Sequence, residues 1–289
     1  MRYRSIFRPD LFANQTHLVT GGGSGIGRCI AHELAALGAH VVLLGRKEPR
    51  LAAVAAEIAE DGGSASYHPL DIRDEERVRA VVEAIVRERG ALHGLVNNAG
   101  GQFPAPLQAI SQKGFETVVR TNLVGGFLMS REVFSQSMQP RGGGAIVNIV
   151  ADMWFGMPGM GHSGAARAGM VNFTETAALE WAPAGVRVNA VAPGWIASSG
   201  LDTYEGPVKA MIPRLRAAVP LSRLGTESEV SAAVLFLLSE AAAFISGATL
   251  RVDGAAPHAT PLWPMHEHDR SRPYQGFHRA VLPKVLSGE

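Results

Sequence analysis

The feature that most constrains this chain is a glycine-rich run near its start, where residues 20–27 read Thr-Gly-Gly-Gly-Ser-Gly-Ile-Gly. The short apolar run 17–19 precedes it, and a second apolar run, 41–44, follows. Between them, apolar residues recur every three to four positions, which is typical of one face of a helix, at Ile26, Ile30, Leu34 and Leu37. The order is therefore strand, glycine turn, helix, strand.

Such a turn is suited to a dinucleotide. Glycines let the backbone approach a pyrophosphate closely, and the N-terminus of the helix offers free N–H groups and the positive end of its dipole. A glycine pattern alone also occurs in ordinary loops, but its place between a strand and a helix favours the binding site. We expect cofactor contacts from Gly21, Ser24, Gly25, Ile26 and Gly27.

Length and composition limit the number of domains, the kinds of partner and the compartment that we expect. The chain has 289 residues, of which 46% are hydrophobic, enough for one large α/β domain or two small ones. A net charge of +1 gives no reason to expect nucleic acid or an anionic membrane as a partner. The single cysteine, Cys29, forms no internal disulfide, which favours a reducing compartment. No apolar run approaches the roughly 20 residues of a membrane span, and the first residues do not resemble a secretory signal. We expect a cytoplasmic protein.

Strand-like and helix-like segments alternate along the chain. Further strands are expected at 66–70, 92–96, 145–150, 186–192 and 248–252, and further helices at 74–89, 111–138 (interrupted by Gly125-Gly126), 165–181 and 227–238. Regular alternation with near-continuous apolar strands predicts a parallel sheet covered by helices on both faces. The fold class predicted is α/β: a single Rossmann-type, doubly wound sheet of about seven strands, formed by residues 1–254.

Residues 255–289 have a different composition. Five prolines interrupt regular structure, and aromatic residues suggest packing, at Pro257, Pro261, Pro264, Pro273 and Pro283 and at Trp263, Tyr274 and Phe277. We expect an extended C-terminal arm that packs on its own or a neighbouring subunit. His266, His268 and Asp269 raise the question of a metal, but no further ligand cluster supports one, and no metal site is expected.

The end of the second expected strand bears on the choice of cofactor. NAD sites usually place an acid there to hold the ribose 2′-hydroxyl, whereas this chain reads Leu44-Gly45-Arg46-Lys47. Two cations suit an adenosine 2′-phosphate, which Arg46 can bind in bidentate fashion and to which Arg28 can add. We therefore favour NADP (as NADPH) over NAD; the alternative is that Arg46 and Lys47 are ordinary solvated charges.

Over residues 11–254 these motifs resemble the short-chain dehydrogenase/reductase family. The resemblance rests on the glycine turn and on five further motifs, at 71–72, 97–100, 121–123, 188–190 and 193–194. It implies that Asp71 and Ile72 lie at the adenine and that the segment Asn98, Ala99, Gly100 lies behind the cofactor. It further implies that the nicotinamide carboxamide faces Pro193, Gly194 and Ile196.

The same resemblance implies that Asn122 joins the catalytic group and that the subunits form a homodimer or homotetramer. For Asn98 and Asn122, turn or helix capping is the alternative. Most members of the family use a Ser and, on the following helix, Tyr-x-x-x-Lys. Counted back from Thr174, Arg167 occupies the Lys position here and Ser163 the Tyr position.

These exchanges alter the chemistry. Arg167 keeps a positive charge that can bind ribose hydroxyls, but it does not release a proton near neutral pH. Ser163 is better suited to donate a hydrogen bond to a developing oxyanion than to act as a base. Exchange between an alcohol and a ketone needs full proton transfer at oxygen and is disfavoured. Reduction of an enoyl thioester sends hydride to the β-carbon and needs only stabilisation of the enolate, which Ser163 can provide.

Residues 162–169 resemble the branch that includes peroxisomal trans-2-enoyl-CoA reductase and the 2,4-dienoyl-CoA reductases. Those relatives carry a Tyr elsewhere in the site, where this chain has Asp152 and Val171. Three side chains are candidate proton donors instead. Asp152 follows a buried strand, where desolvation raises a carboxyl pKa. His162 adjoins Ser163, and imidazole is a side chain commonly used for proton transfer. Tyr204 lies in the loop after Pro193-Gly194. A cap for Asp152 and simple packing for His162 are equally good interpretations.

The loop 153–160 is rich in apolar and methionine side chains, which suit an acyl chain or isoprenoid tail better than a sugar, although a core or subunit contact explains them equally well. Cations that can meet CoA phosphates, or else are solvated, are Lys209, Arg214, Arg216 and Arg223. The leading hypothesis is an NADPH-dependent oxidoreductase that acts on an apolar or CoA-linked acyl substrate such as a trans-2-enoyl-CoA. The alternatives are a dehydrogenase of an apolar alcohol such as citronellol, and an NADP-binding protein with little catalysis.

Overall fold

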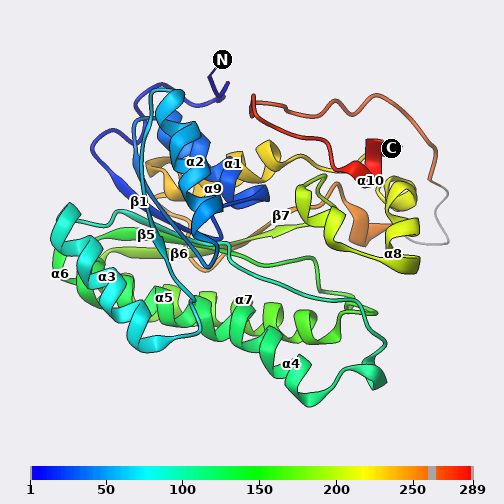
Figure 1. Ribbon diagram of the computed structural model, residues 1–289, viewed down its shortest axis with the longest axis horizontal. Coiled ribbons are helices and arrows are strands. Elements are labelled where there is room, and N and C mark those ends of the chain that lie inside the picture. Colours follow the sequence, from blue (N-terminus) through cyan, green and yellow to red (C-terminus); the bar gives the residue numbers. More distant parts are fainter. Residues whose placement is uncertain (1, 260–264, 288–289) are drawn as a thin grey trace.

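The computed structural model, which describes residues 2–259 and 265–287, is built on one parallel sheet (Figure 1). Its strand order is β3-β2-β1-β4-β5-β6-β7, and every neighbouring pair is parallel. The predicted Rossmann-type sheet of about seven strands is confirmed. The strands are β1 Thr16–Thr20, β2 His40–Gly45, β3 Ser64–Pro69, β4 Gly94–Asn97, β5 Gly144–Ile149, β6 Val186–Pro193 and β7 Thr249–Val252.

Helices cover both faces of the sheet, with α1, α2 and α9 on one and α3, α5 and α7 on the other (Figure 1). The helices are α1 Gly25–Ala36, α2 Glu48–Glu60, α3 Glu75–Arg89, α4 Gln112–Val119, α5 Gly125–Val133, α6 Gln139–Arg141, α7 Gly161–Glu180, α8 Gly206–Met211, α9 Glu227–Leu238 and α10 Lys284–Ser287. Short 3-10 turns cover Leu107–Ala109, Ala182–Ala184, Ser199–Thr203, Ile212–Ala218, Glu240–Ala242 and Ala256–His258. None of the helices among the described residues is long and apolar enough to cross a membrane.

The central strands are buried on both faces, which explains their near-continuous apolar sequences. In β2, Val41 and Leu43 point into the core under α1, α2 and α9, whereas Val42 and Leu44 point into the core under α3 and α5. Because alternate residues of a strand face opposite sides, a strand packed between two helical layers has apolar residues at most positions on both faces. This is the pattern from which the strands were predicted.

The predicted interruption at Gly125-Gly126 is wrong. The backbone is helical from residue 112 to 141 and includes two π-helical segments, Arg120–Val124 and Phe134–Met138. The glycines allow close packing: a Cβ built on Gly125 would lie 2.6 Å from Cδ1 of Ile72, and one built on Gly126 would lie 2.5 Å from Cε of Met170. The helix expected from 165 also begins earlier, at Gly161, so Ser163 lies in its first turn.

The segment 272–280 of the C-terminal arm lies on the same subunit, over α1, α2 and the start of α9. The Phe277 ring is 4% exposed, and its centroid lies 5.8 Å from that of Tyr3. Arg279 forms ion pairs with Glu60 and Asp61 on the far end of α2. Of the arm prolines and aromatic residues named above, Pro261, Trp263 and Pro264 lie outside the described residues.

Candidate active site

The glycine turn joins β1 to α1, and its shape depends on the missing side chains. A Cβ on Gly27 would collide with the carbonyl oxygen of Gly21, and Gly21 itself has φ +66°, which favours glycine. Ser24, the N-cap residue of α1, is exposed and makes no side-chain capping bond. The first N–H groups of α1 therefore have no side-chain partner from the cap, which is the arrangement found at helix N-termini that bind phosphate.

The end of β4 is tied to this turn. The Thr20 hydroxyl oxygen accepts hydrogen bonds from the backbone N–H groups of Asn98 (2.9 Å) and Ala99 (3.0 Å). In return, Nδ2 of Asn98 donates to the backbone oxygen of Thr20 at 3.0 Å. Because the strand order reverses between β1 and β4, these contacts lie at the crevice where open α/β sheets bind ligands.

The cations predicted at the end of β2 differ in their surroundings. Arg46 and Lys47 are exposed, whereas the Arg28 guanidinium forms a bidentate pair with Glu57 at 2.7 and 3.0 Å. Arg28 also lies over the Phe277 ring at 5.0 Å. Arg28 therefore has a packing role in this structure in place of the expected contact with a 2′-phosphate.

Two residues near the glycine turn were not recognised from the sequence. A Cβ built on Gly23 would lie 3.2 Å from Cβ of Arg50, so this cation of α2 stands beside the turn. The carboxylate of Glu227 lies beside Gly25 (3.8 Å from a Cβ built there), and burial raises its pKa to about 7. Neither residue belongs to a local motif; only the packing of α2 and α9 on α1 brings them here.

The adenine-side prediction concerns Asp71 and Ile72. The Asp71 carboxylate is bound by the Arg73 guanidinium at 2.5 and 2.9 Å, and this pairing lowers the pKa of Asp71. The Ile72 side chain is buried against Gly125. The ion pair with Arg73 and the packing on Gly125 thus fix the positions of Asp71 and Ile72.

The structure brings Arg167, Asn122 and Gly100 together. Nη1 of Arg167 donates to the carbonyl oxygen of Ile149 at 2.5 Å, and a Cβ on Gly100 would lie 2.5 Å from Nη2 and 3.2 Å from Oδ1 of Asn122. Burial lowers the pKa of Arg167 to about 10, which still leaves it a cation at neutral pH. The absence of a side chain at residue 100 gives the guanidinium room beside the cofactor crevice.

Ser163 lies in the first turn of α7, close to Asn122. It is fully buried; its hydroxyl donates to Oε1 of Gln102 at 2.7 Å, and Nδ2 of Asn122 lies 3.5 Å from Oγ. The His162 imidazole accepts the Ser163 N–H at Nδ1 (2.8 Å) and packs edge-on against the Phe103 ring, with the centroids 4.4 Å apart.

The three candidate proton donors are therefore placed differently. Asp152 faces β7, where its carboxylate lies 3.9 Å from the Arg251 guanidinium, and burial raises its pKa. His162 contacts Ser163 through the backbone amide. Tyr204 accepts a hydrogen bond from Nε2 of Gln102 at 2.8 Å, so its phenol is connected through one side chain to the Ser163 hydroxyl.

The end of β6 carries the residues expected at the nicotinamide. Pro193 closes the strand, and a Cβ on Gly194 would lie 2.8 Å from Cα of Asp253, so glycine permits the close approach to β7. Ile196 is 6% exposed and forms an isolated parallel bridge with Gly225.

Large apolar side chains are exposed around this end of the sheet, namely Phe103, Leu107, Trp154 and Phe155. Phe155 is 75% exposed and Leu107 69%. Exposed groups of this size in two neighbouring loops are typical of a site for an apolar ligand or partner.

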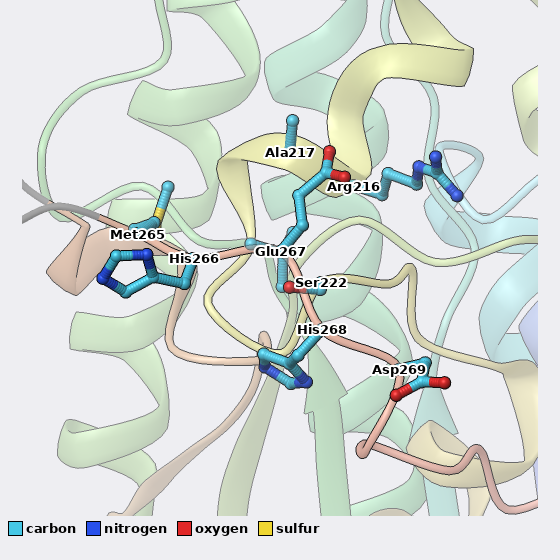
Figure 2. A pocket seen from close by; sticks show the side chains of 9 residues that line it. Arg216, Ala217, Ser222, Met265, His266, Glu267, His268 and Asp269 are labelled. Atoms are coloured by element: carbon cyan, nitrogen blue, oxygen red, sulfur yellow. The ribbon is translucent and has the colours of Figure 1, made fainter.

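A pocket of about 430 Å³ lies between the segment 216–222 and residues 265–269 of the arm (Figure 2). Among the described residues that line it, Arg216 is the only arginine and is a candidate for CoA phosphates. The other candidate nearby, Arg223, is paired with Glu229 at 2.7 Å. Figure 2 shows the His266 and His268 rings pointing in different directions. Across residues 2–259 and 265–287, His, Cys, Asp and Glu form no group of three able to hold a metal ion.

Comparison with known proteins identifies the family. The family model described as Enoyl-(Acyl carrier protein) reductase matches residues 21–255. The peroxisomal 2,4-dienoyl-CoA reductase of Rattus norvegicus is 37% identical over 257 residues, which cover 88% of this chain and 87% of the relative. The chain belongs to the short-chain dehydrogenase/reductase family.

Solved structures of this family share the fold. A citronellol catabolism dehydrogenase (AtuB) of Pseudomonas aeruginosa PAO1 is 67% identical, with a TM-score of 0.80 over 88% of this chain and 99% of that one. A putative NAD(P)-dependent gluconate 5-dehydrogenase of Beutenbergia cavernae, solved with bound NADP, is 34% identical, with a TM-score of 0.81 over 87% and 100% of the two chains. This short-chain protein is thus an oxidoreductase by family.

Proposed function

We propose that this oxidoreductase uses NADPH to reduce the α,β-double bond of an apolar enoyl thioester such as a trans-2-enoyl-CoA. The observation that carries the proposal is that Ser163 and Arg167 lie one turn apart at the start of α7, with the Ser163 hydroxyl near Asn122. The resemblance expects the family Tyr and Lys at these two positions. The relatives include the 2,4-dienoyl-CoA reductase of Rattus norvegicus and a protein of Bacillus subtilis named probable 2,4-dienoyl-CoA reductase, which is 35% identical over 240 residues.

The residues present fit a nicotinamide dinucleotide. The crowded turn at Gly21 and Gly27 and the N-terminus of α1, free of a side-chain cap, form a cradle that a Cβ would fill. When bound, the cofactor would supply hydride. Arg46 and Lys47 are exposed where a 2′-phosphate would lie, and Arg50 stands beside the turn, which supports NADPH over NADH.

The protein groups then have separate tasks. Arg167 holds the ribose hydroxyls as a fixed cation, since a pKa near 10 keeps it protonated at neutral pH. Ser163 donates to the carbonyl oxygen as hydride adds at the β-carbon, the electron pair moves to that oxygen, and the α-carbon then takes a proton from water. An oxyanion donor of this kind contributes about 10²–10³ in rate.

Dehydrogenation of citronellol or a similar apolar alcohol is the second candidate. The 67% identity to a citronellol catabolism dehydrogenase over 88% of the chain favours it. Its chemical demand is different, because alcohol oxidation must remove the hydroxyl proton completely. Ser163 and Arg167 are poor bases near neutral pH, so this reaction needs another acceptor.

One pair of assays separates the candidates. NADPH oxidation is followed with a medium-chain trans-2-enoyl-CoA, and NADP⁺ reduction is followed with citronellol. Reduction of the thioester with little alcohol turnover is expected. Turnover of the alcohol alone refutes the proposal, and binding of NADPH without turnover of either supports a protein with little catalysis.

Two variants test the assigned roles. Ser163→Ala is expected to lower kcat by about 10²-fold or more, as for loss of an oxyanion donor, and an unchanged rate removes Ser163 from the mechanism. Arg46→Ala is expected to weaken NADPH binding far more than NADH binding, measured by fluorescence titration. Equal losses for both cofactors refute the 2′-phosphate contact.

A further inference from the structure

The burial of Ser163 conflicts with the task proposed for it. None of its surface is exposed, yet a donor to the substrate oxygen must touch the substrate. A serine hydroxyl carries a single hydrogen, and here that hydrogen is donated to Oε1 of Gln102 at 2.7 Å. Ser163 can therefore act only if Gln102 leaves.

Gln102 is presented to Ser163 by a firmly held segment. On one side, Asn122 binds both backbone groups of Gly101: Oδ1 accepts its N–H at 2.9 Å, and Nδ2 donates to its carbonyl oxygen at 3.0 Å. On the other side, the Phe103 ring packs on buried His162 with an interplanar angle of 86°. The Gln102 side chain itself is exposed, so it lies between buried Ser163 and solvent.

A second hydrogen bond holds the carboxamide in place. Its Nε2 donates to the phenol oxygen of Tyr204 at 2.8 Å. Tyr204 belongs to the loop after β6, so Gln102 connects that loop to the first turn of α7. The Gln102 carbonyl thus occupies the acceptor position on Ser163 that a ligand carbonyl would need.

We propose that Gln102 is a specificity-determining residue, which covers Ser163 and yields only to a ligand that brings its own carbonyl oxygen. The inference rests on the role of Ser163 in the proposed function. The carbonyl oxygen of such a ligand accepts the same hydrogen bond from Ser163 that Oε1 of Gln102 accepts in its absence. A ligand that displaces Gln102 without an acceptor leaves the hydroxyl unpaired, which lowers its affinity roughly 5- to 150-fold. The contact with Tyr204 keeps the cover closed between turnovers.

Thiol labelling tests the cover without a substrate. The natural chain has one cysteine, Cys29, which is fully buried and whose thiol pKa is raised by burial. Ser163→Cys adds a second thiol under Gln102, and its alkylation by iodoacetamide is followed by peptide mass spectrometry. Adding Gln102→Ala is expected to speed alkylation at 163 about tenfold or more, and adding Tyr204→Phe is expected to speed it less.

Two controls make this result decisive. Gln108→Ala removes an exposed glutamine from the same loop and is expected to leave the rate unchanged. Cys29 reports general opening within each sample. Equal rates at 163 with Gln102→Ala and Gln108→Ala overturn the proposal, as does a parallel increase at Cys29.

Steady-state kinetics with Ser163 intact provide the second measurement, which also applies if the cysteine variants do not fold. Gln102→Ala removes a competing acceptor, so KM for trans-2-enoyl-CoA is expected to fall about 2- to 10-fold, with kcat within about twofold. A higher KM, or a kcat about tenfold lower, overturns the proposal. If the natural protein does not reduce the thioester, the proposed function fails, and the labelling experiment still decides whether Gln102 covers residue 163.

Discussion

Glu227 gives the sharpest prediction of pH dependence. It lies in the first turn of α9 with its carboxylate beside Gly25, and burial raises its pKa from 4.5 to about 7, although the Arg28 charge opposes the rise. Between these two pH values the folded protein holds a proton that the unfolded chain has released. The free energy of unfolding therefore falls as pH rises through this window.

The size of the effect follows from the shift. At about 1.4 kcal/mol per pKa unit, a rise from 4.5 to about 7 corresponds to roughly 3 kcal/mol lost by pH 8. The favourable interaction of a carboxylate with the N-terminus of a helix, about 0.3–1 kcal/mol, is smaller. Glu227→Gln imitates the protonated form, so it is expected to stabilise the protein by about 2–3 kcal/mol at pH 8 and to have little effect near pH 4.5.

Urea unfolding at pH 5 and pH 8, on the natural protein and on the variant, measures this difference. Glu48→Gln, at an exposed position in the first turn of α2, serves as the matched control. Because the other titrating groups are shared, they cancel in the comparison. A difference between Glu227→Gln and the natural protein that is the same at both pH values refutes the reasoning.

Two further predictions concern packing. Gly27→Ala is expected to abolish NADPH binding in a fluorescence titration, since its Cβ would collide with the Gly21 carbonyl. Gly101→Ala, whose Cβ would have no atom of the described residues within 4 Å, is expected to bind normally. Phe277→Ala is expected to lower the free energy of unfolding by about 3–5 kcal/mol in urea, because the ring is 4% exposed against Tyr3; a loss below about 1 kcal/mol contradicts its placement in the core.

The fold was predictable because strands that are buried on both faces consist mostly of apolar residues, which can be recognised in the sequence. Each central strand lies between two helical layers, so each is largely apolar, although β5 and β6 also carry Asn148, Arg187 and Asn189. Gly125 and Gly126 were misread because a glycine that ends a helix and a glycine that admits a neighbour look alike in sequence. Only the three-dimensional structure shows Ile72 and Met170 against them. The start of α7 at Gly161 also lies four residues before the predicted start at 165.

The two halves of the site differ in how far the sequence describes them. The cofactor half depends on backbone geometry, and crowding at Gly21 and Gly27 leaves no alternative to glycine, so a local motif identifies it. Gln102, Arg50 and Glu227 belong to no motif. They reach the site because elements distant in the chain pack together, and a glutamine in a loop carries no signal of its own.

The contacts around Ser163 suggest how a serine could stand on α7 at the position where the family resemblance expects a tyrosine. A short hydroxyl in the first turn is buried and needs a partner when no ligand is present, since an unpaired buried hydroxyl costs about 1–3 kcal/mol. Gln102 supplies that partner at 2.7 Å, and Asn122 fixes the backbone that carries Gln102. The exchange of Tyr for Ser therefore leaves a buried hydroxyl that Gln102 pairs when no ligand is present, and Ser163 is expected to act in catalysis only after Gln102 has left.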